Sequence, residues 1–262
     1  MQVDELPIKV LESLKKGACH QGYFWVYHSP IEKTVLFDYQ PTRGAPAPKR
    51  LLDGFTGYLQ TDGYVAYEEV GQRKGVVHLA CWAHARREFE RALDNDRERA
   101  ETALSWIQDL YATEQQAREE GLSPDERKKL RLEQSLPIIN TLGSWIHEEV
   151  KRVLPKSQIG KAMAYSAKRW DKLSEYLHDG LLEIDNNLVE NAIRPLALGR
   201  KNYLFAGSHK GARRAAMVYS MLGTCKLHGV NPTQWLTHVL AYILQTKYND
   251  VRSLYPQNFT QP

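Results

Sequence analysis

The chain has few cysteines and no long apolar run. Its 262 residues include only Cys19, Cys81 and Cys225, an odd and sparse set that implies no disulfide framework and fits a reducing cytoplasm. No stretch approaches the roughly 20 apolar residues that cross a bilayer, and the N-terminus has no signal-peptide pattern. We therefore expect no membrane partner. The composition, 42% hydrophobic and 25% charged, is that of an ordinary globular protein.

Negative charge is also nearly absent from one segment. Between Asn186 and His228 the chain has seven basic residues and a single acid, Glu190, so this segment carries +6 while the whole chain carries +4. Such a field favours a polyanionic partner, and nucleic acid is the obvious one. Glu190 also stands three residues after Asn187, the spacing of a capping box, so it could simply cap its own helix.

The first 93 residues predict strands more than helices. Aromatic and β-branched runs predict a three-stranded meander. A loop over residues 41–48 and a short helix over residues 49–55 follow it, and two further strands come next. Residues 83–93 are predicted to be helical. The strands are expected at residues 3–11, 22–27, 34–39, 58–61 and 76–81.

The rest of the chain predicts helices. Ser123 to Glu126 forms a capping box with proline at the first helical position, and residues 158–177 have the pattern of one amphipathic helix. Pro195 should bend or end the helix that carries Glu190, and a last helix should begin after Asn231. The tail from Lys247 should be loosely held.

This order predicts an α/β (α+β) fold with a mixed sheet. It is similar to a ribonuclease H-like core of about five strands, with a long helical insertion between the fifth strand and the Glu190 helix. We expect residues 1–93 and 181–230 to form the core, residues 94–180 the insertion, and residues 231–262 a C-terminal helix and tail.

One stretch contains Ile184-Asp-Asn-Asn187, Glu190, Arg194-Pro195 and the run from Leu198 to Ser208. It resembles the signature block of the insertion sequence 66 family of bacterial transposases, and the likeness extends over nearly the whole chain. Other matching stretches are Val3-Asp-Glu-Leu-Pro7, with Leu6 where the family usually has threonine, Gln60-Thr-Asp-Gly-Tyr64, and Cys81-Trp-Ala-His84 with the following Arg86, Arg87 and Phe89.

The resemblance implies a DDE transposase in which Asp4, Asp62 and Glu190 are the catalytic acids. Three carboxylates distant in sequence can hold two Mg²⁺ ions, with Mn²⁺ as a substitute, for in-line phosphoryl displacement on DNA. From the residues alone, Glu5 competes with Asp4, and Asp38 and Asp53 lie in the same region.

Two further groups of residues are candidates for contacts with DNA. Cys81, His84, Arg86, Arg87 and Arg194 could lie near the site; alternatively, Cys81 and Trp82 are core residues and the arginines are solvated. Cys-x-x-His is half of a zinc spacing, but no second pair follows. The DNA-binding candidates are Arg200, Lys201, Tyr203, Lys210, Arg213 and Arg214, with Phe205 expected in the core.

The resemblance implies an N-terminal DNA-binding region before the first acid. Because this sequence starts three residues before Asp4, we expect site-specific recognition of the transposon ends to be absent. We expect DNA as the partner, both transposon ends and target, with a homo-oligomer in the active complex and accessory proteins of the same element. Two alternatives remain open. One is a non-catalytic remnant that binds DNA or dimerises, and the other is a ribonuclease H-like nuclease without strand transfer.

Overall fold

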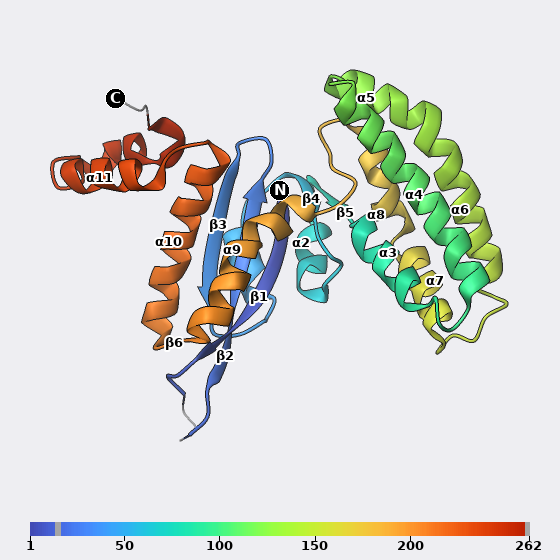
Figure 1. The fold of residues 1–262 in the computed structure, drawn as a ribbon, viewed down its shortest axis with the longest axis horizontal. Helices are drawn as coiled ribbons and strands as arrows, with labels where there is room; N and C mark the ends of the chain where they lie inside the picture. Colours follow the sequence, from blue (N-terminus) through green and yellow to red (C-terminus); the bar gives the residue numbers. More distant parts are fainter. Residues whose placement is uncertain (14–16, 260–262) are drawn as a thin grey trace. The chain divides into compact units, whose positions relative to one another are not determined.

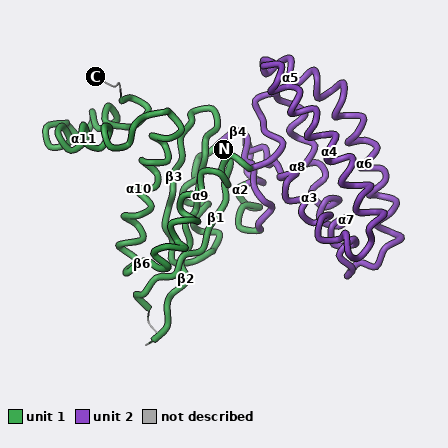
Figure 2. Tube along the Cα trace, viewed as in Figure 1, with its two compact units in different colours: residues 1–55, 65–70, 187–262 green, residues 56–64, 71–186 purple. Residues whose placement is uncertain are grey.

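The computed structural model describes residues 1–13 and 17–259 (Figure 1). They form two compact units (Figure 2). Unit 1 contains residues 1–55, 65–70 and 187–262, and unit 2 contains residues 56–64 and 71–186. The domain boundaries expected from the sequence stay a prediction. None of the described helices combines the length and apolar character that a bilayer crossing requires.

Unit 1 is built on a mixed sheet. The meander β1 (Gln2–Val10), β2 (His20–Ser29) and β3 (Thr34–Gln40) is antiparallel, as its aromatic and β-branched runs predict. The short strand β6 (Phe205–Ala206) pairs in parallel with the end of β1. The mixed α/β class expected from the sequence is thus confirmed.

Two long helices cover one face of this sheet. They are α9 (Asn187–Tyr203) and α10 (His209–Leu227) (Figure 1). Alternate strand residues such as Ile8, Val10 and Phe37 pack beneath them in a continuous apolar core. The Ser220 hydroxyl of α10 accepts a hydrogen bond from the Phe37 amide at 2.8 Å, which fixes the helix against β3.

Shorter elements cover part of the opposite face of the sheet. They include α1 (Pro46–Leu51), η1 (Val65–Tyr67) and the first residues of α2 (Glu68–Gly71). Trp25 and Tyr67 are both buried here and their rings meet edge to face, 5.7 Å apart.

Unit 2 combines two parallel strands with a helical bundle. The strands are β4 (Gly57–Gln60) and β5 (Val76–Leu79). The helical elements are α3 (Trp82–Arg91), α4 (Arg97–Glu119), α5 (Pro124–Leu130), the π-helical η2 (Arg131–Ser135), α6 (Leu136–Glu149), α7 (Gln158–Lys168), α8 (Trp170–Ser174) and η3 (Glu175–His178). Their apolar faces share one core that includes Phe89, Ile107 and Met163. The long helical stretch between β5 and α9 is therefore confirmed.

Helix starts were predicted better than helix ends. The Ser123 capping box, the N-cap at Asn231 before α11 (Pro232–Tyr242) and the start near Asn187 are all confirmed. The single helix expected over residues 158–177 is wrong, because the chain leaves helical geometry at Arg169.

Proline was overrated as a helix breaker. Helix α1 begins at Pro46, inside the expected loop, because proline is tolerated in a first helical turn. Pro195 lies inside α9 and does not end it.

The C-terminal segment is more ordered than expected. It forms η4 (Tyr248–Leu254) and η5 (Pro256–Asn258), and Trp235 Nε1 donates a hydrogen bond to the Leu254 carbonyl at 2.9 Å. The expectation of a loose tail is wrong for residues 247–259, and residues 260–262 lie outside the described part.

Candidate metal and nucleic-acid site

Asp4 and Glu190 belong to the same layer of unit 1. Side chains alternate along a strand, so Asp4 shares the face of β1 with Gln2 and Ile8, the face that α9 covers. Gln2 Oε1 accepts a hydrogen bond from the Val189 amide at 3.1 Å, which holds the first turn of α9 against the start of β1. Glu190 is the acid of that turn. Local register therefore brings both acids to one end of the same face.

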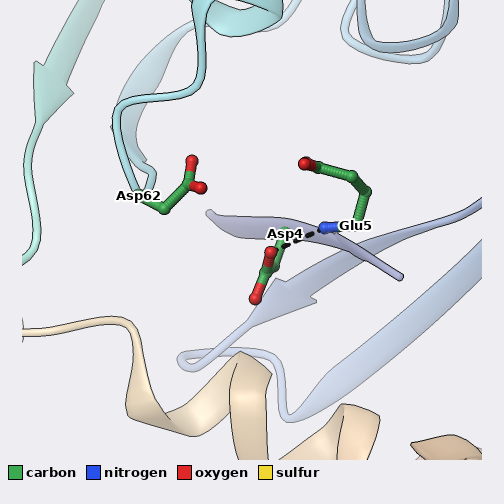
Figure 3. Close-up of side chains that lie close together, drawn as sticks. All are labelled: Asp4, Glu5 and Asp62. Atoms are coloured by element: carbon green, nitrogen blue, oxygen red, sulfur yellow. Dashed lines mark hydrogen bonds between the residues drawn. The ribbon is translucent and has the colours of Figure 1, made fainter. Parts of the chain in front are cut away.

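Glu5 points away from that face and is already bound. Figure 3 shows Asp4 and Glu5 on opposite sides of β1. Glu5 accepts two hydrogen bonds from Arg43, at 2.9 and 2.5 Å, and one from the Tyr67 hydroxyl at 2.7 Å. Its side chain is only 1% exposed. Burial, followed by the neighbouring Glu5 carboxylate, raises the pKa of Tyr67 well above its usual value, so this hydroxyl keeps its proton and remains a donor.

Two other acids in this part of the sequence are Asp38 and Asp53. Asp38 accepts hydrogen bonds from Gln40 at 2.7 Å and Arg50 at 3.2 Å, and Asp53 is exposed after α1. Asp4 lies on the face of β1 that α9 covers, and its role as the acid of β1 stays a prediction.

Asp62 lies on a tight turn that directly follows β4 (Figure 3). Its Oδ1 accepts a hydrogen bond from the Tyr64 amide at 2.8 Å, and Gly63 has a left-handed backbone with φ of 88°. Two side chains of the helical bundle hold this turn. The Tyr165 hydroxyl donates to the Asp62 carbonyl at 2.8 Å, and Arg169 Nη2 donates to the Gly63 carbonyl at 3.1 Å.

Sequence reasoning missed Tyr165 and Arg169. They lie about a hundred positions from Asp62, and no local motif marks them. The Arg169 guanidinium stacks 4.0 Å over the Tyr165 ring, so the two side chains support one another. The bundle thus sets the backbone geometry around the second candidate acid.

Gly63→Ala should destabilise the protein more than another left-handed glycine does. A Cβ at Gly63 would lie 2.4 Å from Arg169 Nε, whereas a Cβ at Gly121, at φ of 62°, would meet no atom of the described residues within 4 Å. We expect Gly121→Ala to cost about 1 kcal/mol of unfolding free energy from backbone strain alone, and Gly63→Ala about 2 kcal/mol or more. Urea unfolding of the two variants measures the difference, and equal costs would show that Arg169 yields freely.

Cys81 belongs to the core of unit 2. It is fully buried, its Sγ accepts a hydrogen bond from the Asn186 amide at 3.4 Å, and burial raises the pKa of its thiol to about 12. A thiol that keeps its proton is neither a nucleophile nor a good metal ligand. Trp82 beside it is equally buried and donates to the Leu173 carbonyl at 2.8 Å. The core interpretation of this pair is therefore the one that the structure supports.

Asp185 and Asn186, which precede α9, are also buried. Asp185 accepts a hydrogen bond from the Tyr111 hydroxyl at 2.8 Å. The Asn186 side chain is fully buried, and neither its amide nitrogen nor its oxygen has a hydrogen-bond partner among the residues that the structure describes.

The arginines of the same motifs face solvent. Arg86 pairs with Glu90 at 3.3 Å on the surface of α3, and both side chains are about half exposed. Arg87 and Arg194 are exposed as well, and His84 is partly buried.

The basic segment divides into one structural arginine and several exposed cations. Arg200 Nη1 donates to the Pro7 carbonyl at 2.5 Å and so ties α9 to β1. Lys201, Lys210, Arg213 and Arg214 are exposed, and Tyr203 is 39% exposed.

Phe205 is 42% exposed, so the expectation of a core residue is wrong. The physical reason is register. Leu204 takes a left-handed turn at φ of 63°, and Phe205 then pairs with Lys9, on the face of β1 that α9 and α10 leave uncovered.

Comparison with known proteins agrees with the motifs. Residues 1–214 match a family model described as "Transposase IS66 family", and residues 220–257 match one described as "IS66 C-terminal element". Two similar proteins come from Sinorhizobium fredii: uncharacterized protein y4qI, 37% identical over 259 residues, and uncharacterized protein y4hP, 31% identical over 265 residues.

These alignments cover 93% and 92% of this chain but 48% of each relative, so the chain spans about half the length of these curated relatives. Uncharacterized protein YuaK of Escherichia coli K12 is 41% identical over 101 residues, which are 38% of this chain and 90% of that protein. No solved structure matches the chain.

Proposed function

Because the chain belongs to the insertion sequence 66 family of transposases, we propose that it is a DDE catalytic domain that cleaves DNA at transposon ends and joins it to a target. The proposed fold is a ribonuclease H-like core. The observation that carries the proposal is the hydrogen bond from the Val189 amide to Gln2, which holds the first turn of α9, with Glu190, against the start of β1, where Asp4 lies. Asp62, on its braced turn after β4, is the proposed third acid.

The donor set fits magnesium. Mg²⁺ prefers hard oxygen ligands and is bound by a few carboxylates together with substrate phosphate oxygens. Asp4, Asp62 and Glu190 would hold two ions, which would stabilise the attacking and leaving oxygens of an in-line displacement. Mn²⁺ would substitute for Mg²⁺ in assays.

Each acid has a support of its own in the chain. Gln2 anchors the helical turn of Glu190, whereas Tyr165 and Arg169 hold the turn of Asp62. The Glu5 amide donates a hydrogen bond to Asp4 Oδ1 at 2.7 Å, while Arg43 and Tyr67 bind the Glu5 carboxylate on the other face of β1. These supports would fix the acids before DNA binds, and such preorganisation favours a charged transition state.

The direct test is cleavage of supercoiled plasmid DNA by the purified chain in Mn²⁺, with strand transfer scored on a labelled oligonucleotide. Cleavage with joined product supports the proposal. Cleavage without joined product favours the nuclease alternative. DNA binding without cleavage favours the non-catalytic alternative.

Exposed cations of α10 and the end of α9 should supply the phosphate contacts. Replacing Lys210, Arg213 and Arg214 together by alanine should weaken DNA binding uniformly across sequences. Each lost phosphate contact should reduce the slope of log affinity against log salt by about 1. Titrations at several salt concentrations measure this slope. Lys129, on the surface of unit 2, provides a matched control, and an unchanged slope in the triple variant would remove α10 from the interface.

A further inference from the structure

One part of the sheet face opposite α9 and α10 gathers aromatic and basic side chains. Lys9 of β1 pairs with Gln21 on one side and with Phe205 on the other, and Tyr23 pairs with Pro7 two positions along. Paired residues point to the same face, so all of them lie opposite α9 and α10. We call Lys9, Gln21, Tyr23, Arg43 and Phe205 the open sheet face.

A cavity of about 450 Å³ lies on this face. Its lining includes Pro7, Lys9, Cys19, Gln21, Arg200 and Phe205. Ligand pockets commonly enclose about 300–1,000 Å³, and a mostly apolar wall with a few polar groups is typical of them. The cavity is therefore large enough for a single planar group such as a nucleobase.

The charge of this face is positive. Lys9 is exposed, and Arg200 lines the cavity while held by the Pro7 carbonyl. Arg43 stands 6.0 Å from the centre of the Tyr23 ring. The nearest acid of β1, Glu5, is bound to Arg43 and almost fully buried. An anionic ligand would meet cations here without meeting a free carboxylate of β1.

We propose that the open sheet face binds an unpaired DNA strand, with one base stacked on Phe205 and the backbone phosphates at Lys9 and Arg200. Aromatic rings on a basic surface bind single strands because every unpaired base offers a stacking face, which a base inside a duplex does not. The choice of DNA as the ligand rests on the proposed function. The site is separate from the exposed cations of α10, which suit duplex phosphates.

The test compares single-stranded and duplex oligonucleotides bound to the full chain without divalent metal. Phe205→Ala should weaken binding of a single strand by about tenfold or more, the effect of losing one stacked base. Duplex affinity should stay within about twofold. Phe205→Trp should retain single-strand binding, since tryptophan also stacks. Tyr248→Ala, which removes a 91% exposed ring elsewhere in unit 1, is the matched control and should change neither affinity.

A strand that contains 2-aminopurine adds a readout specific to stacking. Its fluorescence should be quenched by the wild-type chain and by Phe205→Trp, and not by Phe205→Ala. Unchanged single-strand affinity in Phe205→Ala, or an equal loss for duplex and single strand, would overturn the proposal. These assays need no catalysis. A chain that does not cleave DNA but still quenches the fluorescence would contradict the proposed activity and support the single-strand site.

Discussion

Glu190→Gln should reduce Mn²⁺-dependent DNA cleavage by at least about a thousandfold, which corresponds to about 4 kcal/mol of lost transition-state stabilisation. The change keeps the shape of the side chain and removes one anionic ligand of the proposed metal site. The Gln2 contact to the Val189 amide does not involve this carboxylate, so the first turn of α9 should remain in place. Initial rates of plasmid nicking measure the effect.

Glu133→Gln is the matched control for this prediction. Glu133 is an exposed helical glutamate that pairs with the exposed Lys129 at 3.9 Å, so its replacement should leave cleavage and stability unchanged. DNA affinity measured beside the rate separates binding from chemistry. A Glu190→Gln variant that keeps more than about a tenth of the wild-type rate would show that Glu190 only caps its helix.

Arg131→Met should destabilise the protein by about 3–5 kcal/mol, because it breaks a buried ion pair from one side. Arg131 and Glu114 are both fully buried in unit 2 and share hydrogen bonds of 2.7 and 2.9 Å. The remaining guanidinium donors bind the carbonyls of Tyr176, Asp179 and Leu182. Urea unfolding, followed by tryptophan fluorescence, measures the cost.

Two further variants serve as comparisons for Arg131→Met. Arg131→Lys should also be costly, since an ammonium group cannot reproduce a five-donor fork. Lys129→Met, on the exposed side of the same helical segment, should change stability by no more than about 0.5 kcal/mol. A cost of less than about 1 kcal/mol for Arg131→Met would mean that the pair contributes little to stability.

The same pair predicts how stability depends on pH. Burial alone would raise the pKa of Glu114, but the hydrogen bonds and charges of Arg131 and Arg127 hold it below its usual value of 4.5. A group whose folded pKa is lowered stabilises the protein above its unfolded pKa, and the contribution is lost as pH falls through the folded value. The unfolding free energy of the wild-type chain should therefore decrease as the pH is lowered below about 4.5. The decrease should be smaller in Arg131→Met, in which Glu114 has lost one of its two arginine partners.

Local patterns in the sequence predicted most of the fold. The meander, the capping box at Ser123 and the N-cap at Asn231 depend on neighbouring residues alone, so they can be read without tertiary information. The helix start at Pro46 and the helix end at Arg169 could not be predicted in this way, because tertiary packing decides where a marginal helix begins or ends.

The candidate site was predictable only in part. The family resemblance singles out Asp4, Asp62 and Glu190. The residues alone do not distinguish Asp4 from Glu5, because the two neighbours differ only in the face of β1 that each occupies. The hydrogen bonds from Tyr165 and Arg169 to the Asp62 turn, and the exposure of Phe205, follow from long-range pairing and have no local signal.

Direct titration of Mn²⁺ into the metal-free chain, with bound ions counted by electron paramagnetic resonance, tests the central claim most directly. The wild-type chain should bind two ions, and Asp4→Asn, Asp62→Asn and Glu190→Gln should each lose at least one of them while remaining folded. Mn²⁺ binding that is the same in all three variants as in the wild type would contradict a metal site built from these acids.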